Sequence, residues 1–492
     1  MSARRHQSDE VPKVIKLKII MDKTRDRVIF AESDHEFIDT LFSFLTLPLG
    51  TILRLLDKDM VQLGSISRVY ASVYSIDPKF MHTSHCKSML LMPRNTSETH
   101  CGKLKLNVDH SENAGKLFCC SNYQCRKLVS FLQNMRCCGC GNLMVRSTRL
   151  FEEEEKGSCG EESAVEVFLK GGAASFMITD DFQVMPASTA SYVELFEKLE
   201  VSHRNEIEAV TMEVGIKEVL QLLKFSLLST TPLTNMVLSS KENWVRDTSK
   251  FKDGPTAKSD KKGIPQNINS MSMKLIVSKS KKKVLYAEAG VELVDLLFSF
   301  LAFPLGAVVK LLGCNSKLDC IDNLYKGADD LSSRNYFKSE ECKNRLLSPK
   351  LYPHFGYNSH ILQLEEETPK CRLDRENLAL PLLQQSDKAA RNVAVILDPK
   401  SPTGETVNGE GYLRGPATFM IMDNLLVSPF SPTSSIALLK QLKVPTSDVE
   451  ERNVIVGKDE ALNLLKASLI SKTVLNDVFN RREPSPEIML KV

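Results

Sequence analysis

The sequence is poor in aromatic residues and in net charge. A single tryptophan stands among 492 residues, and Phe, Trp and Tyr together make up 7% of them. The 64 Lys and Arg nearly balance the 61 Asp and Glu, so the net charge of +3 gives no reason, over the whole chain, to expect nucleic-acid binding. Hydrophobic residues at 42% and charged residues at 25% are typical of globular proteins, which excludes a largely disordered or multi-span membrane protein.

Long hydrophobic runs are missing as well. The uncharged segments 40–53 and 296–309 hold 14 residues each, fewer than the ~20 that a transmembrane helix needs. We interpret them as buried core helices, with an anchor at a membrane interface as the alternative, and expect no membrane span.

The two ends of the chain carry no targeting signal that we recognise. The opening MSARRHQSDEVPK lacks the apolar stretch of a secretory signal, and the final EIMLKV carries no lipidation motif. We therefore expect a cytoplasmic or nuclear protein. In such a reducing compartment its 13 cysteines are thiols or metal ligands and not disulfides.

An internal repeat organises the chain. Residues 18–56 and 274–312 are identical at 18 of 39 positions, at a constant offset of 256. The match resumes at three further pairs of segments: those around Cys86 and Cys342, 168–186 with 412–429, and 215–233 with 457–475. The sequence therefore predicts a tandem duplication. Its parts are a polar tail at 1–15, a first repeat at 16–240, a Lys-rich linker at 241–272, a second repeat at 273–480 and a C-terminal tail at 481–492.

Each repeat predicts an α+β fold. In the first, KLKIIMD and RVIFAES flank a charged turn, as the strands of a hairpin do. An apolar helix follows from Asp34 and breaks at Leu47-Pro48, because a proline disfavours helical geometry in the residue before it. A second hairpin, a helix from Ser188 to Leu199, a strand and a helix at 215–229 complete the unit. Hairpins mixed with helices, without regular βαβ alternation, favour α+β.

Nine of the 13 cysteines lie between residues 86 and 159. Cys120 and Cys125 form a C-x4-C pair, and Cys140 forms a second pair with either Cys137 or Cys138. Two such pairs match the spacing of zinc ribbons, in which four thiolates close a tetrahedral structural site. His100 or Cys101 could replace one ligand, and ordinary buried thiols are the alternative to a metal. The second repeat has only Cys371 between 343 and 418 and cannot build the same site.

Other candidate groups point to structure and not to catalysis. Glu36, Asp39 and Ser43 recur as Glu292, Asp295 and Ser299. We interpret the carboxylates as capping groups near a helix N-terminus. No Ser/His/Asp or Cys/His relay can be identified, so no catalytic or cofactor-binding residue is predicted.

The repeated blocks resemble a known family. Leu-Phe-Ser-Phe-Leu, Pro-Leu-Gly, the Cys86 segment, LKLNVD at 104–109 and LLK-x-SL-x-S at 222–229 are similar to the plant-specific family called domain of unknown function 674. The resemblance implies a plant protein with two tandem copies, and no activity, substrate or partner. The family pattern of a Cys pair followed by Cys-x-Cys-Gly favours Cys138 over Cys137. The expected ligands of a structural zinc are therefore Cys120, Cys125, Cys138 and Cys140.

Three functions are compatible with this sequence. The first is a non-enzymatic interaction or scaffold protein, in which two like domains on a flexible linker bind an unidentified protein partner. The second is a zinc-ribbon module that contacts nucleic acid or protein. The third is an enzyme of unrecognised class, which needs a deep pocket with convergent polar groups. We favour the first.

Overall fold

A computed structural model describes residues 13–56, 62–109, 111, 115–125, 128–149, 166–172, 174–198, 207–239, 270–368, 395–401 and 410–480. Cys159, Cys371, most of the predicted linker, most of the predicted N-terminal tail and all of the predicted C-terminal tail lie outside the described residues. The fold mixes helices with three β-sheets.

The first sheet has five antiparallel strands in the order β7-β6-β2-β1-β8. They are β1 (Ile15–Asp22), β2 (Arg27–Ser33), β6 (Phe176–Thr179), β7 (Val184–Pro186) and β8 (Ile207–Val214). Strands β1 and β2 form the first predicted hairpin, and β6 and β7 form the second. Short turns connect each pair, which is why sequence neighbours are also sheet neighbours.

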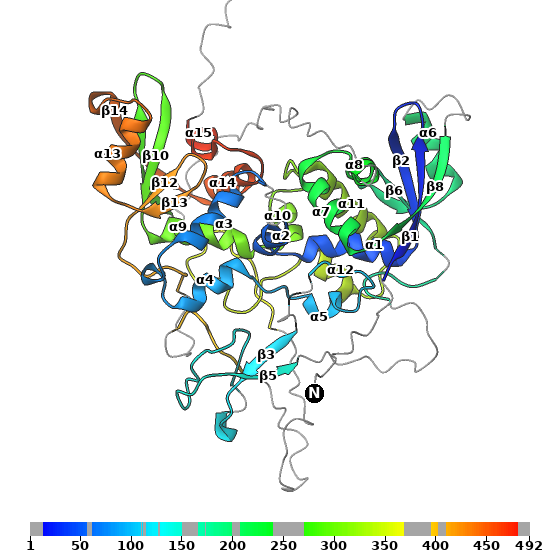
Figure 1. The fold of residues 1–492 in the computed structure, drawn as a ribbon, viewed down its shortest axis with the longest axis horizontal. Coiled ribbons are helices and arrows are strands. Elements are labelled where there is room, and N and C mark those ends of the chain that lie inside the picture. The colour runs from blue at the N-terminus through cyan, green and yellow to red at the C-terminus, as the bar shows by residue number, and fades with distance from the viewer. Residues whose placement is uncertain are drawn as a thin grey trace, which may run out of the picture.

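The second sheet has the corresponding order β13-β12-β10-β9-β14. Its strands are β9 (Met271–Ser278), β10 (Lys283–Ala289), β12 (Phe419–Met422), β13 (Val427–Pro429) and β14 (Val449–Val456). The two sheets lie at opposite ends of the molecule, with helices between them (Figure 1).

The apolar segments form broken helices at the centre. The first consists of α1 (His35–Phe42), the 3-10 turn η1 (Ser43–Thr46) and α2 (Leu49–Leu56), and the second of α9 (Val291–Ser299), η6 (Phe300–Ala302) and α10 (Leu305–Leu311). Each break precedes the proline of a Pro-Leu-Gly motif, as the sequence predicts. The side chains of these helices fill the core, and Phe42 and Phe298 have no exposed surface.

The two breaks meet each other. Pro48 and Pro304 form an antiparallel bridge. The Leu49 N–H donates to the Phe303 carbonyl at 3.0 Å, and the Leu305 N–H donates to the Leu47 carbonyl at 2.9 Å. This pair of hydrogen bonds joins the two halves of the chain at equivalent positions.

The remaining helices surround this centre. They are α3 (Ile66–Ser75), α4 (Ser84–Leu91), α5 (Glu98–Cys101), α6 (Thr189–Lys198), α7 (Ile216–Leu228) and α8 (Pro232–Ser239) in the first half, with α11 (Asp319–Ser333), α12 (Glu340–Leu347), α13 (Pro432–Gln441), α14 (Lys458–Ile470) and α15 (Val474–Phe479) in the second. Short 3-10 turns are η3 (Pro78–Phe80), η4 (Tyr123–Cys125) and η7 (Thr446–Asp448).

Each half places helices against the sheet of the other half. Helix α3 of the first half lies beside β13, where the Ser72 hydroxyl accepts a hydrogen bond from the Val427 N–H at 2.8 Å. Helix α11 of the second half lies beside β7, where Gly327 packs against Val184. Figure 1 shows the same crossing, with α3 and α4 on the side of the second sheet and α11 and α12 on the side of the first.

The exchange joins the halves into one core. A single cluster of buried apolar side chains runs from Ile15 to Leu475 and includes residues of both sheets. Two domains on a flexible linker would each bury their own core, so this arrangement differs from that expectation. The physical reason is that one of the helices that pack on each sheet, α11 on the first and α3 on the second, comes from the opposite half of the chain.

Candidate metal centre

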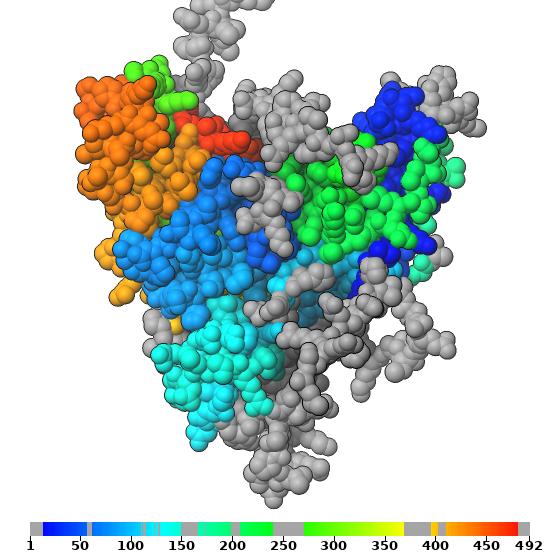
Figure 2. Space-filling view, in the orientation of Figure 1, coloured from blue at the N-terminus to red at the C-terminus, as the bar shows by residue number. Residues whose placement is uncertain are grey.

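The cysteine-rich segment forms a lobe that projects from the helical body (Figures 1 and 2). Its sheet contains β3 (Lys116–Cys119), β4 (Leu128–Ser130) and β5 (Arg146–Arg149) from the first half. The short strand β11 (Val395–Ile396) of the second half pairs with β4 in parallel and completes the order β11-β4-β3-β5. Sequence reasoning missed β11, because nothing in its local sequence indicates that it joins a sheet more than 250 residues away.

The lobe has only a small apolar core of its own. It consists of Phe118, Cys120, Cys125, Met135, Cys137, Met144 and Leu397. Phe131 connects the lobe to the body, since its ring lies 5.2 Å from the ring of Tyr352 and 5.6 Å from that of Phe355. A core this small rarely stabilises a fold by itself, and small natural modules add disulfides or a metal.

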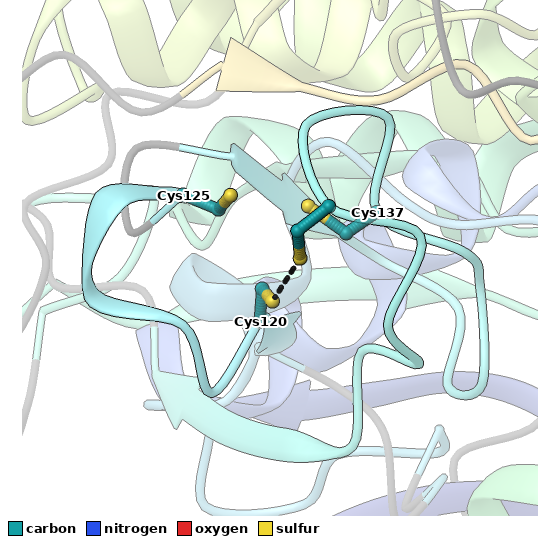
Figure 3. A group of neighbouring side chains, drawn as sticks. Cys120, Cys125 and Cys137 are labelled. Atoms are coloured by element: carbon teal, nitrogen blue, oxygen red, sulfur yellow. Dashed lines mark hydrogen bonds between the residues drawn. The ribbon is translucent and has the colours of Figure 1, made fainter.

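Four thiols converge within this core. The sulfur atoms of Cys120, Cys125, Cys137 and Cys140 all lie within 4.8 Å of one another, and those of Cys120 and Cys140 are 3.3 Å apart (Figure 3). Four sulfurs around a tetrahedral zinc, each at ~2.3 Å from the ion, would stand ~3.8 Å apart. The four residues therefore fit the donor set and the spacing of a structural zinc site.

The backbone of each cysteine pair turns its sulfurs toward the same point. In the second pair, the Cys137 N–H donates to the Asn142 carbonyl at 2.8 Å and the Gly141 N–H donates to the Cys137 carbonyl at 2.8 Å. Gly141 has φ of +73°, which glycine adopts without strain. Gly139 allows a close approach, because a Cβ there would lie 2.9 Å from the Cys125 sulfur.

The structure differs from the expected ligand set at one position. Cys137 is buried and joins the other three thiols, whereas Cys138 is exposed and lies outside the group. The spacing Cys137-x2-Cys140 is compatible with Cys137 as the fourth ligand, whereas the family pattern favoured Cys138. Adjacent side chains in a non-helical segment point to opposite sides, so packing of Cys137 against the lobe core turns Cys138 toward solvent.

His100 and Cys101 do not approach the four thiols. Cys101 is buried in the main core, 3.6 Å from the Thr46 hydroxyl, and burial raises the pKa of its thiol to about 12. The His100 ring lies 2.6 Å from the Val167 carbonyl and 3.7 Å from the Cys342 sulfur. Neither residue serves as a substitute ligand in this arrangement.

Three of the four thiols have pKa values that differ from one another. Burial raises the pKa of Cys120 to about 11 and that of Cys125 to about 12. The pKa of Cys140 is lowered to about 7, first by the Asn142 N–H and then by the Cys120 thiol, which both donate hydrogen bonds to its sulfur. A bound divalent cation would supply the positive charge needed to hold all four sulfurs as thiolates.

Asp39 and Asp295 are not helix caps, so that interpretation was wrong. Asp34 caps α1 instead. The Asp39 carboxylate is buried and accepts hydrogen bonds from the backbone N–H groups of Val167, Phe168 and Leu169, at 3.2, 3.1 and 3.0 Å. Asp295 accepts from the N–H groups of Tyr412 and Leu413, at 2.9 and 3.0 Å. Each carboxylate thereby holds in place the segment that leads into the outer hairpin of its sheet, which is β6-β7 for Asp39 and β12-β13 for Asp295.

We expect the Asp39 carboxylate to stabilise the fold strongly and in a pH-dependent way. Burial raises the pKa of Asp39 and of Asp295 to about 7 from the ordinary value of 3.8. The folded state therefore binds more protons than the unfolded state between about pH 4 and 7, so this contribution to stability is complete below pH 4 and declines as pH rises through 7. Asp39→Ala should cost ~3 kcal/mol or more, because it leaves three buried N–H groups without an acceptor.

Urea unfolding at pH 5 and pH 7.5 measures both effects. Asp39→Asn with Asp295→Asn should flatten the decline of stability with pH, whereas Asp330→Asn, on an exposed position of α11, should leave the slope unchanged. If the stability of the double Asn variant declines with pH as steeply as that of the wild type, the pH dependence does not come from Asp39 and Asp295.

Comparison with known proteins identifies one family. A family model described as protein of unknown function (DUF674) matches residues 11–459. No curated protein and no solved structure matches the chain. Among the described residues, no helix combines the length and the apolar character needed to cross a membrane.

Proposed function

The chain belongs to the DUF674 family, and from this premise we propose that it is a non-enzymatic binding protein whose projecting lobe is held in shape by a structural zinc ion. The observation that carries the proposal is the convergence of the Cys120, Cys125, Cys137 and Cys140 sulfurs. When bound, the ion would link the two turns of a lobe whose own core is too small to hold them.

A structural role fits the donor set better than a catalytic one. Catalytic zinc sites keep one coordination position for water or substrate, whereas four thiolates close the coordination shell. The four cysteines come from two turns of the lobe. A cavity near Ser43, Asn95 and Cys101 has a volume of about 10 Å³, the space of a single water molecule. The closed donor set supports a structural site, and with it binding as the function.

We further propose that the body is the product of a tandem duplication. The corresponding strand orders of the two five-stranded sheets support this proposal, as do the two broken helices that meet at Pro48 and Pro304. In this proposal the two copies form one rigid frame and not two binding domains on a linker. The frame presents the single cysteine lobe.

The full-length chain, purified without added chelator, should contain about one zinc per molecule by elemental analysis. Cys120→Ser and Cys140→Ser should each remove most of the zinc, because three thiolates no longer close the site. Cys138→Ser is the matched control, since it deletes a neighbouring exposed thiol, and its zinc content should equal that of the wild type.

Chelation with EDTA should then increase amide hydrogen exchange in residues 115–149 before it affects the two large sheets. Absence of zinc from the wild type, together with unchanged stability of the Cys120→Ser variant, would reject the metal centre. Loss of zinc from the Cys138→Ser variant, with retention in Cys137→Ser, would reassign the fourth ligand.

A further inference from the structure

The lobe has a charge that the chain as a whole does not have. Residues 113–151 contain no Asp or Glu, but they contain Lys116, Arg126, Lys127, Arg136, Arg146 and Arg149. The chain has a net charge of only +3, so this segment is a local positive region in a nearly neutral protein. Four thiolates around a divalent ion would add a charge of only −2 at its centre.

Apolar side chains lie exposed among these cations. Leu143 is 46% exposed and Val145 is 47% exposed. Leu143 forms a β-bridge with Arg136, so their side chains lie beside each other on one face. Val145 is two residues further on, whereas the side chain of Arg146, the next residue, points to the opposite face of its strand. Both arginines are exposed as well. A partner strand with apolar side chains on one face and acidic side chains on the other can cover the apolar pair and meet Arg146 at the same time.

The same surface ends in the edge of a sheet. Strand β5 pairs with β3 on one side, from Cys119 opposite Arg146 to Lys116 opposite Arg149. Within the part of the chain that the structure describes, no strand pairs with the other side of β5. A sheet edge offers backbone N–H and C=O groups to an added strand, and this is a common way to bind an extended peptide.

We propose that the β5 edge of the lobe binds an extended acidic peptide segment of a partner protein. The segment adds a strand to the order β11-β4-β3-β5, its Asp or Glu side chains lie on the face of Arg146, and its apolar side chains cover Leu143 and Val145 on the face of Arg136. This inference rests on the proposed function, because the thiol cluster sets the position of the turn that leads into β5.

The exposed residues favour a peptide over a nucleic acid. Proteins that bind single strands stack the bases on exposed aromatic rings. The rings of Phe118 and Phe131 are buried, and, among the side chains that the structure describes, the exposed apolar residues beside the two arginines are aliphatic. Binding of a nucleic acid in place of a peptide is an outcome that the experiment below detects.

The test uses the full-length zinc-loaded chain and fluorescence anisotropy with labelled peptides of about ten residues. The probe alternates Asp with Val, a pattern that puts charge on one face of a strand and apolar groups on the other. Its first control replaces every Asp by Lys. Its second carries N-methyl groups on alternate backbone amides, which prevents strand addition on one edge. The acidic peptide should bind at least about tenfold more tightly than either control, and less tightly as salt rises.

Matched variants connect binding to the surface. Arg136→Glu with Arg146→Glu should weaken binding by about tenfold or more, and Leu143→Ser with Val145→Ser should weaken it as well. Arg25→Glu with Arg334→Glu makes the same charge change at exposed positions of the body, and the affinity should stay at the wild-type value.

Zinc content, measured on every sample, separates this inference from the proposed metal centre. If the wild type holds zinc but does not prefer the acidic peptide, the peptide site is overturned and the metal centre stands. Unchanged affinity in the Arg136/Arg146 variant with its zinc retained also overturns the site. Tighter binding of a single-stranded RNA than of the acidic peptide replaces the proposed partner by a nucleic acid. If the wild type contains no zinc but binds the acidic peptide, and the Arg136/Arg146 variant does not bind it, the peptide site is supported and the metal centre is rejected.

Discussion

Residues 1–240 expressed alone should not give a stable folded monomer. The first sheet would lose α11, whose Gly327 packs on Val184 and whose Asn323 side chain donates to the Asp181 carbonyl at 3.0 Å. Helix α3 would lose its contacts with β13 and α9, and α4 would lose those with η6, so the apolar side chains that now pack there would be exposed. Unfolding free energies of domains are only about 5–15 kcal/mol, so loss of half of a shared core should abolish folding.

Circular dichroism and size-exclusion chromatography of the isolated half measure this effect. The matched control is co-expression of residues 1–255 with 256–492, which breaks the chain within the predicted linker but supplies both halves. This pair should elute as a 1:1 complex and melt cooperatively near the full-length chain. A monomeric 1–240 fragment with a sharp thermal transition would show that the first half is self-sufficient.

Gly306→Ser and Gly50→Ser should each destabilise the whole molecule. A Cβ at Gly306 would lie 2.6 Å from the Leu346 carbonyl oxygen and 3.0 Å from that of Leu45. A Cβ at Gly50 would lie 2.8 Å from the Leu90 carbonyl oxygen and 3.1 Å from that of Leu301. In both cases these are backbone atoms, the nearer one in the same half of the chain and the other in the opposite half, so helices within one half and the contact between the halves must both shift. Overpacking of a core costs about 1–3 kcal/mol and occasionally more, and we expect at least the upper end here.

The control substitutions are Gly215→Ser and Gly457→Ser, at the N-termini of α7 and α14. There the nearest atoms to a Cβ are the carboxylate oxygens of Glu218 and Glu460, which are ends of flexible side chains. Serine is also favoured at a helix N-cap that has Glu three residues later. Thermal melting should show a large loss for the two central glycines and no loss for the two caps. Equal melting temperatures in all four variants would mean that the backbone does not approach Gly50 and Gly306 as closely as described.

Local sequence was sufficient for much of the secondary structure. The hairpins β1-β2 and β6-β7, the break before Pro48 and the helix at 216–228 all depend on neighbouring residues: alternating apolar side chains, a charged turn, or a proline. The burial of Phe42 and Phe298 also follows from helical periodicity. Cys120, Cys125 and Cys140 were identified from their spacing. A turn that brings two thiols to one point needs only a few residues between them, and glycines make such a turn possible.

Other features depend on residues that are distant in sequence. Cys137 and Cys138 have the same chemistry and nearly the same spacing, and only the packing of the lobe core determines which of them joins the cluster. Asp39 has the sequence context of a capping residue, but its partners are three N–H groups about 130 residues away. No local pattern predicts either arrangement, because the free energy gained comes from contacts made after the chain has folded.

The sequence by itself determined the α+β elements, the repeated blocks, the membership in the family and the cysteines available to a metal. Only the tertiary structure decided that the halves exchange helices, share one core and complete the cysteine lobe with a strand from the second half. The repeated blocks have closely similar apolar faces, so either sheet is chemically suited to the helices of either half. Hydrophobic burial has no direction and does not distinguish these partners. The close approach at Gly50 and Gly306, and the paired hydrogen bonds beside Pro48 and Pro304, fix which surfaces meet.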